Sequence, residues 1–207
     1  AYPLLPTRRR HKPNSLEMKN IIAFFNNIRP LSEKTMGLIG EIFVPAELKK
    51  GEYFIRKGEF AKEIAFLETG IVRAYYNTSD GREYNKTFFS APSIIGSYAS
   101  LINGQKNVVA QQALTDCEIW RASFHKIEEL SEGNFEIERL RRVIAEGYFL
   151  SNEKKEIEMA LLDADKRYLI LQKEYPGIES EIPQYHIAAY LGISPTQLSR
   201  IRKKMTQ

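Results

Sequence analysis

The sequence predicts an α+β protein in which a β-roll, or jelly roll, is followed by a long helix and a C-terminal helix-turn-helix. From about Phe43 to Arg121, glycines recur at seven- to fifteen-residue intervals among short runs rich in Val, Ile, Tyr and Phe. Short strands at this spacing are typical of an antiparallel roll. After Ser123 the apolar residues change to helical spacing. Two short amphipathic segments then flank Leu191-Gly192-Ile193 near the end of the chain.

Composition is that of an ordinary globular protein. The chain has 207 residues, of which 43% are hydrophobic and 27% charged. Cys117 is its one cysteine, which excludes an internal disulfide and a multi-cysteine metal centre within one chain. Its apolar runs are far shorter than the roughly 18 residues of a membrane span, and the chain does not open on a signal-peptide pattern. We expect a cytoplasmic protein without membrane contact.

Basic residues gather at the two ends of the chain. The overall formal charge is +4. Residues 1–16 hold four basic side chains and no acid, and residues 182–207 hold another four and no acid, so the body between them has a balance of −4. A mildly acidic body with a basic C-terminal end suits a protein that meets a polyanion at one place.

The first seventeen residues differ from the rest of the chain in their residue pattern. Prolines and the RRRHK cluster interrupt any periodicity, and Met18 opens a fresh amphipathic segment. We interpret Met18 as a native start and residues 1–17 as an extension or tag remnant. A basic DNA-binding arm is the alternative.

Residues 18–133 are expected to form the sensing domain. Two helical pieces precede the strands, the second of them beginning at Ser32. Asp80-Gly81 indicates a hairpin turn, because such a turn needs a positive φ that glycine adopts cheaply.

Residues 134–162 are expected to form a long dimerisation helix. Its apolar positions, with Gly147 and Lys154 completing the series, repeat every three or four residues, as in a coiled coil. The alternative is a long helix that packs only on its own roll. The residues predicted at the dimer interface are Leu140, Val143, Gly147, Leu150, Ile157 and Leu161.

Residues 163–207 are expected to form a helix-turn-helix domain, with Asp163 as the N-cap of its first helix. A helix beginning near Pro183 ends at Gly192, which suits a left-handed turn. Ser194 is placed as the N-cap of the final helix, and Pro195 as its first residue, where a missing N–H costs nothing.

The final helix carries polar and basic side chains opposite its apolar face. Hydroxyl, amide and guanidinium groups can read base edges, and cations can contact phosphates. The alternative is an ordinary helical hairpin with a solvated basic end. The residues predicted to bind DNA are Ser194, Pro195, Thr196, Gln197, Ser199, Arg200, Arg202, Lys203 and Lys204.

The chain resembles the Crp/Fnr superfamily of transcription regulators from about Met18 to Lys204. The resemblance rests on the order and spacing of LKKGEYFIRKGE, IAFLETGIVRAYY, DGRE, Ile95-Gly96, LTDCEIW, the long helix and the tail. It implies a cyclic-nucleotide-binding-type β-roll and a winged helix-turn-helix in a bacterial homodimer. It also implies double-stranded DNA and RNA polymerase as partners. With so few residues between Tyr175 and Ile182, we expect the wing to be shortened or absent.

The resemblance also argues against cyclic AMP as the effector. In cAMP-binding members a Gly-Glu pair contacts the ribose and an Arg-Ser pair the phosphate. The matching positions here are Gly96-Ser97 and Asn107-Val108, and a buried phosphate without a cation is costly. Lys106 should face the other way on its strand. The predicted effector pocket consists of Gly96, Ser97, Tyr98, Asn107 and Val108.

Cofactors are not expected. The oxygen-sensing cysteine set is missing, and none of the three histidines falls in the interior strands of the roll, with His186 expected to cap or lie exposed on the first helix of the DNA motif. Clustered metal ligands for an oxygenase are absent, so we expect no enzyme. A ligand-binding module without a DNA role is the remaining alternative. Alternate aromatic residues should point into the roll, either lining a ligand pocket or filling it, namely Tyr75, Tyr76, Phe88, Phe89 and Tyr98.

Overall fold

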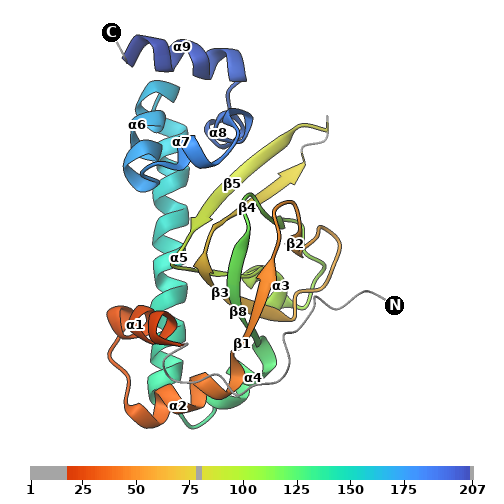
Figure 1. The fold of residues 1–207 in the computed structure, drawn as a ribbon, viewed down its shortest axis with the longest axis vertical. Helices are drawn as coiled ribbons and strands as arrows, with labels where there is room; N and C mark the ends of the chain where they lie inside the picture. The colour runs from red at the N-terminus through yellow and green to blue at the C-terminus, as the bar shows by residue number, and fades with distance from the viewer. Residues whose placement is uncertain (1–17, 78–80, 206–207) are drawn as a thin grey trace.

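The computed structural model describes residues 18–77 and 81–205, and its fold is α+β as the sequence predicts. Figure 1 shows a β-roll beside one long helix, with short helices at both ends of that helix. Residues 1–17 and Asp80 of the expected turn lie outside the described residues. Gly81 has the positive φ of 81° that the turn prediction requires.

In the described part of the chain, eight strands form two four-stranded antiparallel sheets that face each other. The strand order is β1-β8-β3-β6 in one sheet and β2-β7-β4-β5 in the other. Leu67, Val72, Ile95 and Ile119 belong to the apolar cluster that fills the roll. The strands are β1 (Val44–Leu48), β2 (Tyr53–Ile55), β3 (Glu63–Thr69), β4 (Ile71–Asn77), β5 (Glu83–Ser90), β6 (Ser93–Ile95), β7 (Ala110–Ala113) and β8 (Cys117–Ser123).

Helices close one end of the roll. The helices α1 (Lys19–Ile28), α2 (Glu33–Ile42) and α4 (Phe124–Ser131) pack with the beginning of α5 (Phe135–Leu161) around a second apolar cluster. Ser32 caps α2 as predicted, since its side chain accepts a hydrogen bond from the backbone N–H of Thr35. The short helix α3 (Tyr98–Asn103) lies between β6 and β7.

The predicted long helix is α5, which contains 27 residues and begins at the N-cap Asn134. It runs the length of the molecule in Figure 1. One face packs on the roll, where the Tyr148 hydroxyl donates to the carbonyl of Ile94 at 2.5 Å. Burial at this contact raises the pKa of Tyr148 to about 12.

The C-terminal helices are α6 (Ala164–Glu174), α7 (Ile178–Glu181), α8 (Gln184–Leu191) and α9 (Pro195–Met205). Asp163 caps α6 as predicted, accepting from the backbone N–H of Lys166 at 3.0 Å. The expected position of the wing holds α7, and no strand follows Ser123 in the described part of the chain. None of the described helices is both long and apolar enough to cross a membrane.

Candidate DNA-binding surface and effector region

The turn between α8 and α9 has the geometry that its sequence predicts. Gly192 ends α8 at φ +68°, in the left-handed region that glycine tolerates. The Ser194 hydroxyl accepts a hydrogen bond from the backbone N–H of Gln197 at 3.2 Å. In return, the Gln197 side chain accepts one from the backbone N–H of Ser194 at 2.9 Å. This reciprocal capping box fixes the start of α9 and engages the amide oxygen of Gln197.

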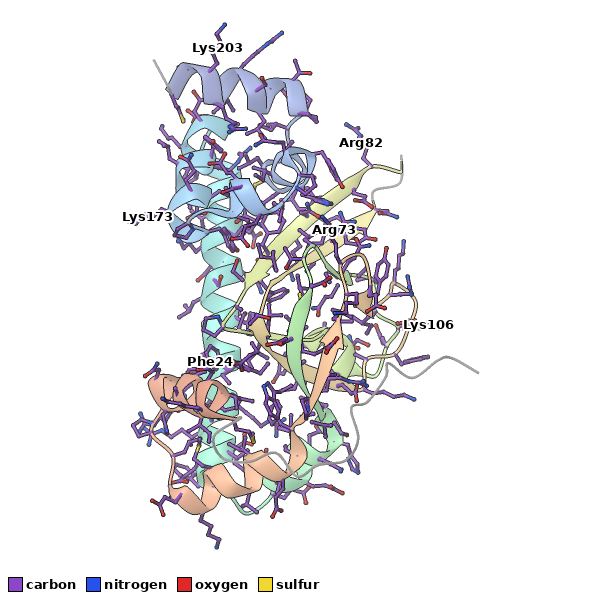
Figure 2. All side chains as sticks on the ribbon, in the orientation of Figure 1. Phe24, Arg73, Arg82, Lys106, Lys173 and Lys203 are labelled. Atoms are coloured by element: carbon purple, nitrogen blue, oxygen red, sulfur yellow. The ribbon has the colours of Figure 1, made fainter. Side chains whose placement is uncertain are left out.

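The two sides of α9 differ in burial and chemistry. Leu198 and Ile201 are buried in an apolar cluster that the C-terminal helices share with Ile71, Phe88 and Leu114 of the roll. Thr196, Arg200 and Lys203 are exposed and, at 100° per residue, project from the opposite side of the helix. Pro195, Ser199 and Lys204 are also exposed. Figure 2 shows Lys203 pointing away from the rest of the molecule.

Arg202 and Lys204, both predicted phosphate contacts, form ion pairs with neighbouring C-terminal helices. Arg202 is half-buried, and its Nε lies 3.4 Å from Oε1 of Glu179 on α7. Lys204 Nζ lies 2.7 Å from Oδ2 of Asp165 on α6, and this contact raises the pKa of Lys204. The Arg202 and Glu179 side chains are 42% and 23% exposed, whereas Lys204 and Asp165 are 75% and 34% exposed. A duplex would therefore have to compete with Asp165 for Lys204.

The first helix of the motif, α8, is docked on the β-roll. His186 was expected to cap or to lie exposed, and this expectation is wrong: the residue is only 4% exposed. Its ring faces Arg73 of β4, and its backbone carbonyl accepts a hydrogen bond from the Asn85 side chain on β5 at 2.8 Å. The position of His186 on α8 could be predicted, but the strands that cover it are distant in sequence.

A polar cluster around the buried Arg73 side chain connects three strands to α8. The Arg73 guanidinium donates to Glu83 at 2.5 Å and to Gln112 at 2.7 Å. Its side chain is 5% exposed, so these partners satisfy a charge that burial would otherwise make costly. Burial and the Arg73 charge lower the pKa of His186 to about 4. An arginine within the apolar run IVRAYY was the one sequence signal for this cluster.

Lys155 is a second connection between the domains. Its ammonium donates to the backbone carbonyl of Lys86 on β5 and lies 3.6 Å from the ring centroid of Tyr190 on α8. The long helix, the roll and the C-terminal domain therefore meet at this side chain. Burial lowers the pKa of Lys155 to about 7.

The residues predicted to form an effector pocket include a hydrogen-bonded pair, Ser97 and Asn107. Asn107 Oδ1 accepts from the hydroxyl of Ser97 at 2.5 Å and from the backbone N–H of Val109 at 3.1 Å. Its amide donates to the carbonyls of Arg56 and Val109. Asn107 thus holds two loops together where cAMP-binding relatives have their arginine. Lys106 is exposed and points outward (Figure 2), but it lies in the irregular segment before β7 and not on a strand as expected.

The aromatic residues that were expected to point into the roll make different contacts from one another. Phe88 leaves the roll and stacks on Tyr190 of α8, with 5.2 Å between ring centroids. Phe89 packs against the interior cluster, and Tyr98 contacts Phe124 edge-on. Tyr75 points to the outer face of its sheet, where its hydroxyl lies 3.0 Å from that of Tyr53. They therefore do not line one common pocket.

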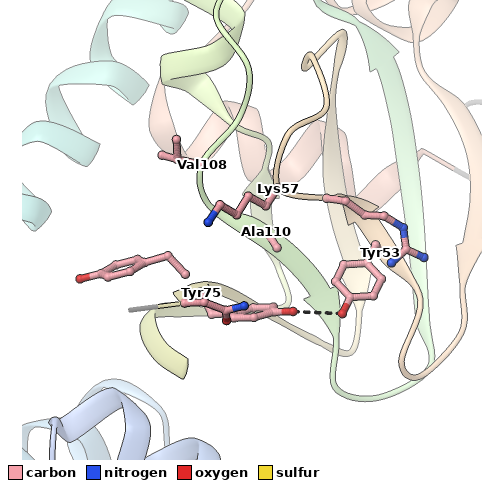
Figure 3. Close-up of a pocket in the computed structure, with 8 residues that line it drawn as sticks. Tyr53, Lys57, Tyr75, Val108 and Ala110 are labelled. Atoms are coloured by element: carbon pink, nitrogen blue, oxygen red, sulfur yellow. Dashed lines mark hydrogen bonds between the residues drawn. The ribbon is translucent and has the colours of Figure 1, made fainter. Parts of the chain in front are cut away.

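A cavity of about 190 Å³ lies beside the Tyr53–Tyr75 pair (Figure 3). Of the predicted effector residues, only Val108 lines it. Its aromatic and basic wall includes Tyr53, Arg56, Lys57 and Tyr75. Tyr75, Tyr76 and Val108 were expected near a ligand pocket, but Arg56 and Lys57 were not, because residues from three separated segments form the cavity.

The predicted dimer seam is largely exposed on α5. Leu150, Ile157 and Leu161 are 62%, 53% and 77% exposed, and they lie opposite the face that packs on the roll. Gly147 is also exposed and Val143 half-buried. Leu140 is buried in its own protomer, so it has little surface left for a partner. Only the part from Val143 to Leu161 is available for the predicted interface.

Comparison with known proteins identifies the class of the domain. Residues 45–134 match the family model of the cyclic nucleotide-binding domain. FixK2 from Bradyrhizobium japonicum is similar in structure, with a TM-score of 0.69 and 20% identity over 80% of this chain and 85% of that chain. A Crp/Fnr family transcriptional regulator from Eubacterium rectale has a TM-score of 0.69 and 18% identity, over 87% and 88%. No curated protein matches the sequence.

Another similar structure is CLP from Xanthomonas campestris, described as a c-di-GMP-responsive global regulator. Its TM-score is 0.64 and its identity 19%, over 84% of this chain and 92% of that chain. Residues 45–134 of the present chain are thus similar to the cyclic nucleotide-binding domain. The chain has the fold of these three proteins, of which the Eubacterium rectale protein is described as a Crp/Fnr family regulator.

Proposed function

We propose that the protein is a DNA-binding transcription regulator of the Crp/Fnr type that acts as a homodimer on a palindromic operator. The observation that carries the proposal is the outward face of α9. Thr196, Arg200 and Lys203 are exposed side by side, and residues 182–207 contain no acidic side chain. Such a helix offers base-reading and phosphate-binding groups without repelling a polyanion.

The exposed apolar seam of α5 supports the homodimer. Leu150, Ile157 and Leu161 repeat at coiled-coil spacing on a helix whose other face is already buried. Pairing two copies along this seam would remove large apolar side chains from water. In a two-fold dimer, the two α9 helices would enter successive major grooves about 34 Å apart.

The effector is proposed to be something other than cyclic AMP bound in the usual mode. Asn107 is neutral and already bonded to Ser97 and to backbone groups. A cyclic phosphate at this place would have to break those bonds without gaining a cation. Calorimetry with cyclic AMP should therefore give no micromolar binding, and a micromolar dissociation constant would contradict the proposal.

The proposal is tested by selecting bound duplexes from a random DNA library and measuring their affinity by fluorescence anisotropy. We expect selected sites to be palindromic, with half-site centres about one helical turn apart, and to bind about 10³-fold or more tightly than scrambled duplexes. A ligand-binding module without a DNA role would enrich no sequence and would bind every duplex equally weakly.

A further inference from the structure

The cavity beside Tyr53 and Tyr75 lies on the outside of the roll and is called the outer-face pocket. Its other wall residues include Arg56, Lys57, Val108 and Ala110. In Figure 3 these side chains come from β2 and the loop after it, from β4, and from β7 with the segment before it. The residues matching the cAMP contacts of the family, Gly96, Ser97 and Asn107, do not line it.

Strand alternation places the pocket outside the roll. Val72 on β4 and Ala113 on β7 point into the interior cluster. Tyr75 and Ala110 are three residues from them on their strands and pair with each other, so they share the opposite face. Arg73 belongs to the same outer face, and its guanidinium lies 3.7 Å from the Tyr75 ring centroid.

The walls of the pocket combine flat rings with positive charge. The Arg56 guanidinium lies 3.9 Å from the centroid of the Tyr53 ring. The Tyr53 and Tyr75 hydroxyls are 3.0 Å apart, so the pair shares one hydrogen bond and keeps a second proton to donate. Within the described chain, neither Arg56 nor Lys57 forms an ion pair with a carboxylate. Two cations and a hydroxyl donor thus stand beside an aromatic surface.

We propose that the outer-face pocket binds a small aromatic ligand that carries one phosphate or carboxylate group. The ring would pack against Tyr75 and Ala110, and the anion would be held by one of the two cations, Arg56 or Lys57, together with the tyrosine hydroxyls. The volume of about 190 Å³ is below the range of drug-sized sites, which favours a single ring system with one anionic group.

Contacts lead from this pocket to the helix-turn-helix. Tyr75 packs on Arg73, and Arg73 contacts His186 of α8 at 3.1 Å. A ligand that moved Tyr75 would therefore act on the contact that docks α8 to the roll. The proposed effect of the ligand on DNA binding, called the effector role, rests on the proposed DNA-binding function. The proposed binding of the ligand to the pocket does not rest on that function.

The binding test uses phenyl phosphate and benzoate as probes, with phenol and inorganic phosphate as half-probes. Backbone amide NMR shifts are followed in the full-length protein. We expect saturable shifts at Tyr53, Tyr75 and Val108, with a dissociation constant of about a millimolar or tighter for at least one anionic ring. The half-probes should bind roughly tenfold more weakly or worse. Whichever of phenyl phosphate and benzoate has the lower dissociation constant shows whether the pocket prefers a phosphate or a carboxylate.

Variants decide whether the pocket is responsible. Arg56→Met with Lys57→Met changes only exposed side chains, so the fold should remain and probe binding should weaken roughly tenfold or more. Lys106→Met removes another exposed cation outside the pocket and should bind like the parent. Equal binding by the double variant would overturn the proposal. So would shifts confined to Ser97 and Asn107, phenol binding as tightly as phenyl phosphate, or no saturable shift.

Effector action is measured separately by repeating the DNA titration with and without the preferred probe. A change in affinity that disappears in the Arg56→Met, Lys57→Met variant supports the effector role. Saturable probe binding with unchanged DNA affinity would contradict the effector role and leave the binding site standing. Absence of sequence-specific DNA binding would contradict the proposed function and not the pocket.

Discussion

The guanidinium of Arg73 on β4 lies 3.1 Å from Nδ1 of His186 on α8, measured from Nη1. Arginine can only donate hydrogen bonds, so Nδ1 is the acceptor and the ring proton is on Nε2. The histidine is therefore neutral, in agreement with a pKa lowered to about 4 by burial and by the neighbouring positive charge. This contact connects α8 to the β-roll.

Replacing Arg73 with Met should weaken the contact between α8 and the β-roll. The variant removes the bonds to Glu83, Gln112 and His186 while keeping most of the apolar volume. We expect the free energy of unfolding to fall by about 2–3 kcal/mol, because Glu83 is partly exposed and can be rehydrated. Urea denaturation gives this loss, and hydrogen exchange should show faster opening of α8.

Arg121→Met is the matched control. Arg121 is also largely buried and pairs with Glu63 at 2.6 Å, but it lies in the other sheet, away from α8. Its loss should lower stability without selectively exposing α8. If the amides of α8 are equally protected from hydrogen exchange in the two variants, the Arg73–His186 contact does not hold α8 on the roll.

Titration of His186 should make stability depend on pH. Its pKa is about 4 in the folded protein and 6.5 as an ordinary value, so between these values the unfolded chain binds more protons. Stability therefore rises with pH through this window, and the contribution is lost as the pH falls from 6.5 to 4. This difference in the pKa of His186 corresponds to at most about 3 kcal/mol of the free energy of unfolding.

His186→Gln supplies the measurement, because glutamine keeps polar groups but does not titrate. Urea midpoints of this variant, measured from pH 4 to 7, should rise less steeply with pH than those of the parent. His125→Gln is the control, since His125 is exposed and faces Glu129 on α4. If the parent and His186→Gln have the same slope, the histidine is not the titrating group.

Charges placed in the α5 seam should separate the predicted dimer. Leu150→Glu with Ile157→Glu puts carboxylates at two exposed seam positions, where pairing would bury them against each other. Light scattering at micromolar concentration should then give monomers. A control variant, Phe60→Glu with Ile102→Glu, changes two equally exposed apolar residues away from α5 and should remain dimeric. A double seam variant that stays dimeric would place the interface elsewhere.

Local features of the C-terminal motif could be predicted because neighbouring residues determine them. Ser194 caps α9, and Gly192 ends α8 at a positive φ, both through contacts within a few residues. The Arg73–His186 contact could not be found in this way, because it joins positions 113 apart. The outer-face pocket and the burial of Leu140 likewise depend on how separate segments pack.

Arg200→Ala should reduce sequence-specific binding. Arg200 is exposed on the outward side of α9, where a guanidinium can bond both O6 and N7 of guanine. The variant should lose about 1–3 kcal/mol on the selected site and relax its preference at one position of each half-site. Anisotropy titrations on selected and scrambled duplexes make the comparison. An equal loss on both would identify Arg200 as a backbone contact and leave readout to Thr196, Gln197 and Ser199.

The pair between Lys204 and Asp165 predicts how the edge of α9 meets phosphate. Lys204 Nζ is 2.7 Å from Oδ2 of Asp165, so DNA must compete with this carboxylate for the ammonium. Asp165→Asn should therefore strengthen binding to selected and scrambled duplexes alike, by roughly two- to fivefold at moderate salt. Lys204→Ala should weaken both alike and lower the salt dependence by up to about one ion per subunit. The double variant Asp165→Asn, Lys204→Ala should not show this increase in DNA affinity, because the increase comes from the Lys204 ammonium that Asp165 no longer binds. If the gain persists in the double variant, Asp165 repels the duplex directly and its pairing with Lys204 does not limit binding.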